Sequence, residues 1–124
     1  MPGLEPGTWA YHGDNGMKFG GSYTGVKYGE SYGTGDTIRC NLDFSSNTVT
    51  YHKNSKFLGR LYIPHIPWFS SLTCLIGTAF HDVRGRLFPV IGIDHPDVVL
   101  EYRFPSSLLL SSASWYRQLG ARIS

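Results

Sequence analysis

One stretch constrains the fold more than any other, residues 35–59 with the sequence GDTIRCNLDFSSNTVTYHKNSKFLG. In its first part apolar and polar side chains alternate, and four residues share the apolar side: Ile38, Cys40, Leu42 and Phe44. A period of two places successive side chains on opposite sides of an extended chain. The pattern therefore predicts a strand with one buried face.

A second and a third strand follow within the same stretch. After the polar turn SSNT at 45–48, Val49 and Tyr51 alternate with polar residues. The sequence KNSK at 53–56 then predicts a tight turn into residues 57–58, because asparagine tolerates positive φ. We expect a three-stranded antiparallel meander within an all-β fold.

Four blocks of the chain resemble, in order, segments of the SPRY domain family. The meander has the form GD-x-I-x-C-x-L-D-F, then T-V-x-Y, then K-N-x-x-x-L-G. Upstream, WAYHGDNG at 9–16 resembles the family segment W-x-Y-H-G-D-D-G, which marks the Ran-binding-protein type. Downstream, LFPVIG at 87–92 resembles the L-Y/F-P-x-x-G strand of the family. The resemblance covers about residues 2–104 and implies an antiparallel β-sandwich.

The same resemblance predicts a sandwich that is incomplete at the N-terminus. Family members carry several further strands before the segment that corresponds to 9–16, and only residues 1–8 precede it here. The chain is then a fragment, a truncated gene product or a domain completed by another chain. Strand edges left unpaired would invite aggregation or strand addition.

Residues 60–77, RLYIPHIPWFSSLTCLIG, interrupt the resemblance as an atypical apolar insertion. Without them the chain would read FLGTAFHDVRGRLFPVIG, which continues the family sequence without a break. We consider two origins: a segment retained in a gene model and not selected to fold, or a true lineage-specific loop. An apolar insertion must form its own strand pair, cover the sheet or remain as an exposed patch.

Three further stretches complete the predicted organisation. Residues 13–35 hold eight glycines and four aromatic side chains, which favours one long ordered loop with short strand pieces. Apolar and polar side chains alternate over 98–104, which predicts a closing strand. The predicted partial SPRY domain therefore covers residues 1–104. The tail, 105–124, is predicted to contain a short helix over 108–119 with Ser107 as its N-cap, or to be a frayed end.

The composition argues for one folded domain and against several functional classes. With 124 residues, 41% of them hydrophobic, the chain has too much apolar content for disorder. A net charge of +2 is too small to indicate nucleic acid or an anionic membrane. No apolar run approaches the roughly 20 residues of a membrane span, and the N-terminus lacks the features of a signal peptide. We expect a cytoplasmic or nuclear protein.

No motif indicates catalysis, a metal or a cofactor. The five histidines have no metal-ligand spacing, and no serine or cysteine lies on a nucleophile elbow such as G-x-S-x-G. Cys40, on the apolar side of its strand, is predicted to be a buried and inert thiol. An RNA surface would need basic residues interleaved with exposed aromatic ones, and the relevant side chains are scattered: Lys18, Lys27, Tyr28, Arg84 and Arg86. We therefore expect no enzyme activity, no cofactor and no nucleic-acid partner.

The candidate binding residues come from the family resemblance. In SPRY domains the ligand surface is formed by loops at one end of the sandwich. These loops include the Y-H-G-D-D-G segment and the loop after the L-F-P-x-x-G strand. They correspond here to six partner-binding residues: Tyr11, Asp14, Asn15, Asp94, His95 and Pro96.

The chemistry of these residues suits an extended peptide. Tyr11 offers a rigid aromatic face and a hydroxyl at low entropic cost, so Tyr11→Ala is expected to weaken binding without unfolding the domain. The carboxylates and the amide supply acceptors for backbone amides or a basic side chain. As an alternative, Asp14 caps its own loop as an Asx-turn. Asn15 stands where relatives have a second aspartate, and Trp9 is expected in the core.

The resemblance implies a non-catalytic protein-interaction module. Such a module captures a short peptide or loop of a partner protein, often within ubiquitin-ligase substrate adaptors and other scaffolds. Two alternatives come from other classes. One is a carbohydrate- or RNA-binding β-sandwich that uses the glycine- and aromatic-rich loop, and the other is a truncated gene product without function.

Overall fold

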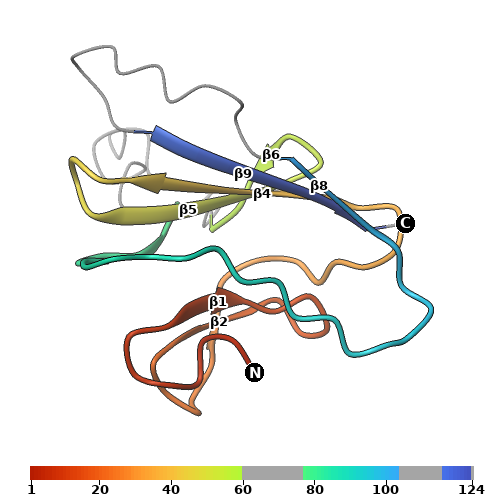
Figure 1. The fold of residues 1–124 in the computed structure, drawn as a ribbon, viewed down its shortest axis with the longest axis horizontal. Coiled ribbons are helices and arrows are strands. Elements are labelled where there is room, and N and C mark those ends of the chain that lie inside the picture. The colour runs from red at the N-terminus through yellow and green to blue at the C-terminus, as the bar shows by residue number, and fades with distance from the viewer. Residues whose placement is uncertain (60–76, 104–115, 124) are drawn as a thin grey trace, which may run out of the picture.

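The computed structural model describes residues 1–59, 77–103 and 116–123, the last of these by the course of their backbone. The predicted insertion at 60–77 lies outside the described residues except for Gly77. Phe104 at the end of the predicted closing strand, and residues 105–115 and Ser124 of the predicted tail, lie outside them as well. The described chain forms two antiparallel sheets (Figure 1). Within it, no helix is long and apolar enough to cross a membrane.

The smaller sheet is built from the N-terminal segment and the glycine-rich region. Its three strands are hydrogen-bonded in the order of the chain: β1 (Trp9–Tyr11), β2 (Met17–Gly20) and β3 (Val26–Lys27). The glycine-rich stretch thus contains short strand pieces, as predicted. Its third strand ends before a loop that runs over residues 28–36 to the larger sheet.

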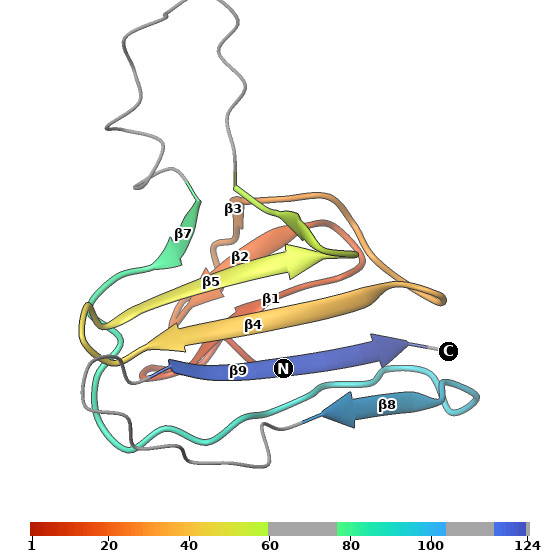
Figure 2. The same ribbon diagram turned by 90° about the horizontal axis from the view of Figure 1, so that it is seen from above.

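The larger sheet contains the predicted meander. The meander strands are β4 (Thr37–Asp43), β5 (Thr48–Lys53) and β6 (Lys56–Phe57), and they pair antiparallel in sequence order. Three strands from later in the chain join them: β7 (Thr78–Phe80), β8 (Leu100–Arg103) and β9 (Tyr116–Ile123). The order across the sheet is β6-β5-β4-β9-β8, and β7 pairs with β5 (Figure 2). An all-β fold with antiparallel strands is confirmed.

Polar side chains fix the two turns of the meander. Between β5 and β6, Asn54 and Ser55 both have positive φ, 48° and 69°, as a tight two-residue hairpin turn requires. Between β4 and β5, the Asp43 carboxylate accepts hydrogen bonds from the backbone N–H and the hydroxyl of Ser45, at 2.8 and 2.6 Å. The register of the hairpin follows, with Asp43 opposite Thr48.

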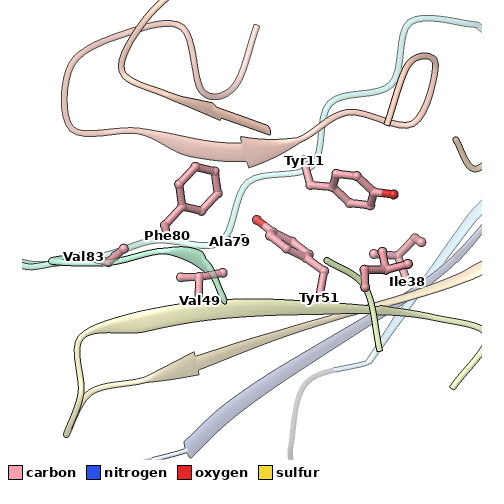
Figure 3. Packing of buried hydrophobic residues seen from close by; sticks show 8 residues of the cluster. Tyr11, Ile38, Val49, Tyr51, Ala79, Phe80 and Val83 are labelled. Atoms are coloured by element: carbon pink, nitrogen blue, oxygen red, sulfur yellow. The ribbon is translucent and has the colours of Figure 1, made fainter. Parts of the chain in front are cut away.

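The core lies between the two sheets and is centred on β5. Its side chains come from both sheets and from the residues that follow β6 and β7 (Figure 3). They are Tyr11, Ile38, Val49, Tyr51, Leu58, Ala79, Phe80 and Val83. Trp9, Cys40 and Leu42 are partly buried against them, which agrees with the core positions expected from the sequence. Phe44, the last residue of the predicted apolar side, is exposed because it lies in the turn beyond β4.

Two predictions are corrected by the structure. The segment at 87–92, which the resemblance gave as a strand, belongs to neither sheet, and Phe88 and Val90 are exposed. The helix predicted over 108–119 is wrong for 116–119, because these residues begin β9. A short isolated helix is marginal in water, whereas β4 offers a strand edge of seven residues along its whole length. Pairing with that edge overrides the local helix signals.

Removing residues 116–124 tests the place of β9. Without β9 the backbone of β4 loses its partner over residues 37–43, and β8 loses its only partner in the described sheet. We expect faster hydrogen exchange of β4 amides and a lower melting temperature, by about 4–8 °C for each kcal/mol lost. Removing Ser124 alone is the control, and unchanged exchange in β4 after the longer deletion would contradict the assignment.

Candidate functional site

Tyr11 lies at the end of β1, and its side chain points into the protein. It is only 6% exposed, and its hydroxyl donates a hydrogen bond to the backbone oxygen of Glu30. Its ring meets the rings of Tyr32, Tyr51 and Tyr28, with centroids 5.1, 5.3 and 5.5 Å away. Neither its aromatic face nor its hydroxyl is available to a partner. The expected role of Tyr11 as a surface contact is therefore corrected to a core role.

The four rings form a tyrosine cluster, which we define as Tyr11, Tyr28, Tyr32 and Tyr51. The hydroxyl of Tyr32 donates to the backbone oxygen of Tyr11 at 2.7 Å, and that of Tyr28 donates to Gly77 at 2.8 Å. Burial raises the pKa values of Tyr28 and Tyr32 to about 12, and it raises that of Tyr51 as well. The hydroxyls thus stay protonated and act as structural donors. The tyrosines within the glycine-rich stretch were the sequence signal for this cluster.

The β1–β2 turn presents the two polar candidates differently. The side-chain oxygen of Asn15 accepts a hydrogen bond from the N–H of Met17 at 2.9 Å, and the N–H of His12 donates to the backbone oxygen of Met17 at 2.9 Å. The Asx-turn considered for Asp14 is thus formed by Asn15 instead. The carboxylate of Asp14 is exposed, 3.4 Å from the side-chain nitrogen of Asn15.

Close backbone contacts hold this turn in one conformation. The N–H of Tyr32 donates to the backbone oxygen of Gly13 at 2.8 Å, and a Cβ added at Gly13 would lie 2.8 Å from Tyr32. Gly16 has φ of +67°, and a Cβ there would lie 2.3 Å from the backbone oxygen of Gly29. No side chain fits at either position. Lys27 adds a hydrogen bond from its Nζ to the backbone oxygen of Asn15 at 2.7 Å.

The second candidate loop, with Asp94, His95 and Pro96, is exposed at all three residues. Its polar contact is internal, because the N–H of Asp97 donates to Nδ1 of His95 at 3.3 Å. Figures 1 and 2 show this loop and the β1–β2 turn toward the same end of the molecule, the end where β9 finishes.

Pro2 lies between these two loops. Its backbone oxygen accepts a hydrogen bond from Nε2 of His12 at 2.8 Å, and a Cβ added at Gly92 would lie 3.2 Å from its Cδ. The structure therefore places Asp14 and Asn15 at the same end as Asp94, His95 and Pro96. The hydrogen bonds that Asn15 and His95 make stay within their own loops or reach Lys27.

A charged cluster that sequence reasoning missed braces the loop at 28–36. Nζ of Lys53 lies 3.4 Å from the carboxylate of Asp36 and 3.8 Å from that of Glu30, and Lys56 also contacts Glu30. Asp36 accepts hydrogen bonds from the N–H of Gly33 at 3.0 Å and from the side chain of Asn54 at 2.7 Å. These contacts tie the loop to the turn between β5 and β6. The spacing of the charges in the sequence gave no signal, because the loop brings them together.

The described residues offer little for catalysis or metal binding. Burial raises the pKa of the Cys40 thiol to about 11, so this thiol is protonated at neutral pH. Burial and the nearby Arg39 lower the pKa of His52, whose Nδ1 lies 3.3 Å from the side-chain nitrogen of Asn41. Within the described ranges, no three His, Cys, Asp or Glu side chains come together as a metal site.

The basic residues considered for RNA binding are engaged by the protein itself. Nζ of Lys18 donates to the backbone oxygen of Ala79 at 2.6 Å, and it lies over the rings of Phe80 and Tyr28, 5.6 and 5.8 Å from their centroids. Arg84 pairs with Asp82 at 3.2 Å. Arg86 lies over the ring of Phe88, with its guanidinium carbon 5.6 Å from the centroid.

Comparison with known proteins gives consistent matches. A family model described as SPRY domain matches residues 1–104. Ran-binding protein 9 of Xenopus tropicalis is 33% identical over 107 residues, which are 86% of this chain and 16% of that protein. Ran-binding protein 9 of Homo sapiens is 33% identical over 104 residues, 84% of this chain and 12% of that protein.

A kinase also carries a similar segment. The dual specificity protein kinase splA of Dictyostelium discoideum is 32% identical over 101 residues, 77% of this chain and 3% of that protein. The chain therefore spans less than a fifth of the length of these relatives. No solved structure matches the chain at a comparable level of significance.

Substituting Tyr11 tests its core role. We expect Tyr11→Ala to lower the free energy of unfolding by about 3–5 kcal/mol, because it removes a buried ring and leaves a cavity. Tyr11→Phe keeps the ring and loses one hydrogen bond, which costs about 0.5–1.5 kcal/mol. Urea unfolding followed by near-ultraviolet circular dichroism measures both. Tyr23→Ala, at a tyrosine that is 77% exposed, is the control, and equal stability of Tyr11→Ala and Tyr23→Ala would refute the core role.

The carboxylate of Asp36 makes stability depend on pH. Hydrogen bonds from Gly33 and Asn54, and then the charge of Lys53, hold the pKa of Asp36 below its usual value of 3.8. Stability from this group is therefore present above pH 3.8 and is lost as the pH falls through the lower pKa of the folded state. We expect Asp36→Asn to be less stable than the parent at neutral pH, and this difference to shrink below pH 3.8.

Urea midpoints between neutral and acidic pH measure this effect. Asp82→Asn is the matched control, because that exposed carboxylate pairs with the exposed Arg84, outside the charged cluster. A difference between parent and Asp36→Asn that stays constant with pH would contradict the assignment.

Proposed function

Because the chain belongs to the SPRY domain family, we propose that it is a non-catalytic module that holds a short peptide or loop of a partner protein. The family is one of protein-interaction modules. The binding surface in this proposal is the pair of loops at the end of the molecule where β9 finishes, the β1–β2 turn and residues 94–96.

One observation supports this surface most strongly, the rigid β1–β2 turn with its exposed Asp14. Two glycine positions that admit no side chain fix the backbone, and Asn15 and Lys27 add hydrogen bonds. Asp14, within this turn, is exposed to solvent. A preformed loop loses little conformational entropy when a partner binds, so a few contacts suffice for affinity.

The exposed groups define the chemistry of the partner. Asp14 and Asp94 are acceptors with negative charge, and His95 and Pro96 lie beside Asp94. A carboxylate accepts hydrogen bonds from backbone N–H groups of an extended chain, and charge-assisted bonds from lysine or arginine. We therefore expect a partner segment that is extended and carries at least one basic side chain.

Tyr11 does not contact the partner in this proposal, but it holds the β1–β2 turn in place from the core. Its backbone oxygen accepts the hydroxyl of Tyr32, and the N–H of Tyr32 holds Gly13 within the β1–β2 turn. Substitutions of Tyr11 thus act on binding through the position of the turn and through stability. The contact residues in the proposal are Asp14, Asn15, Asp94, His95 and Pro96.

The proposed module works within a larger assembly in the cytoplasm or the nucleus. Relatives such as Ran-binding protein 9 are several times longer than this chain, so a module of this kind occurs in larger proteins. A ubiquitin-ligase substrate adaptor or another scaffold is the context that we propose. Affinity purification of the tagged chain from cells, with and without Asp14→Asn, tests it: ligase subunits lost with the variant support the context, and their absence with the parent overturns it.

A peptide selection tests the binding surface directly. Peptides are selected on the parent chain from a displayed library of random dodecapeptides, and their affinities are measured by fluorescence polarisation. We expect the selected peptides to contain lysine or arginine. Asp14→Asn should weaken their binding by about tenfold or more, since a hydrogen bond to a charged group contributes about 1.5–3 kcal/mol.

The matched control is Asp82→Asn, an exposed carboxylate on the loop after β7. Asp82 has positive φ, which asparagine also tolerates, so the control leaves the fold intact. Equal affinity of the two variants for the selected peptides would contradict the assignment of Asp14.

A further inference from the structure

Exposed apolar side chains are concentrated in one part of the described chain. Phe88 and Val90 are 71% and 70% exposed, and four more apolar residues follow them on the way into β8: Ile91, Ile93, Val99 and Tyr102. The chain leads from this segment directly into β8 (Figure 2). A concentration of exposed apolar side chains is typical of a region where another molecule binds.

The strand that this segment enters is the last of the larger sheet. In the described part of the chain β8 pairs with β9 on one side, and no strand pairs with its other side. Such an edge presents backbone N–H and C=O groups to any strand that approaches. Charged side chains commonly protect such edges from unselective pairing, and Leu100–Arg103 carries one charge of each sign. Exposed apolar side chains therefore precede, along the chain, a strand edge that no described strand covers.

The charges of β8 indicate which strand fits this edge. Glu101 and Arg103 lie on the same face of the strand, and the guanidinium contacts the carboxylate through Nε at 3.1 Å and through a terminal nitrogen at 2.9 Å. Both side chains are exposed. If two copies of β8 meet antiparallel about a two-fold axis at Tyr102, Glu101 of each copy lies opposite Arg103 of the other. Opposite charges at directly facing positions stabilise a strand pair, and like charges destabilise it.

We propose that β8 is a self-association edge, at which a second copy of this chain adds its own β8 in antiparallel register. A two-fold interface requires that the same surface be complementary to itself, and the order Glu101-Tyr102-Arg103 meets that condition. A shift by two residues in either direction would place Glu101 opposite Glu101 or Arg103 opposite Arg103. A shift by one residue would bring opposite faces of the strands together. The charges thus select a single register.

This inference goes beyond the proposed function, because it needs no other protein and concerns a different surface. The proposed peptide surface consists of the β1–β2 turn and residues 94–96, and none of these residues belongs to β8. The two proposals can therefore fail independently. Peptide affinity tests the proposed peptide surface, and the mass of the chain without peptide tests self-association.

Charge exchange tests the register of the pair. Sedimentation equilibrium of the parent chain should show a monomer and dimer whose ratio depends on concentration. Glu101→Arg or Arg103→Glu alone places like charges opposite each other, and each should raise the dimer dissociation constant at least tenfold. The double variant E101R/R103E restores opposite charges and should dimerise as the parent does.

A mixture of the two single variants gives the sharpest result. One then carries arginine at both positions and the other glutamate at both, so an equimolar mixture should form a heterodimer although each alone stays monomeric. Arg84→Glu is the matched control, because Arg84 pairs with Asp82 at the same sequence spacing away from β8. It should leave the dimer dissociation constant unchanged.

The outcomes decide the proposal. Near-ultraviolet circular dichroism confirms that each variant is folded, which these exposed positions favour. A parent chain that remains monomeric up to millimolar concentration overturns the proposal. A dimer that is insensitive to both charge changes, or a mixture that does not associate, overturns it equally.

Discussion

The contact on which the rest of this structure depends is the packing of four tyrosine rings between the two sheets. Tyr11 comes from the smaller sheet, Tyr51 from the larger sheet, and Tyr28 and Tyr32 from the chain that joins them. Aromatic rings supply large buried area, and their hydroxyls still need partners. Here each of three hydroxyls donates to a backbone oxygen, those of Tyr11, Tyr28 and Tyr32. The cluster therefore packs the layers together and also fixes the backbone around it.

The candidate surface follows from this packing. A loop of short polar and glycine residues has no reason to adopt one conformation by itself. It does so here because Tyr32, held by its own hydroxyl, donates its N–H to Gly13 and closes off the space that a side chain would need. The charged cluster around Lys53 ties the loop at 28–36, which carries Tyr32, to the turn between β5 and β6. Rigid loops on a packed sandwich are a common way to present binding residues.

The features that could be predicted from the sequence are those that depend on interactions between neighbouring residues. The meander was predicted strand by strand, because alternation and the turn residues Asn54 and Ser55 act over a few positions. The short strand pieces within the glycine-rich stretch 13–35 were also predicted correctly. Tyr11 was misplaced, since an aromatic residue next to a polar turn has the same local pattern whether its ring points outward or inward. The strand at 87–92 and the helix across 116–119 failed for a related reason, because strand pairing is decided by partners far along the chain.

The sequence by itself determined the all-β class, the antiparallel meander, the buried side of β4 and β5, and the match to the family model over residues 1–104. These depend on side-chain periodicity and on the φ values that asparagine and glycine permit, and both are properties of neighbouring residues. Only the tertiary structure decided that Tyr11 is buried, that β9 lies between β4 and β8, and that Glu101 and Arg103 face outward on the last strand of the sheet. Burial, strand order and edge position depend on which distant segments meet, and no local pattern encodes that.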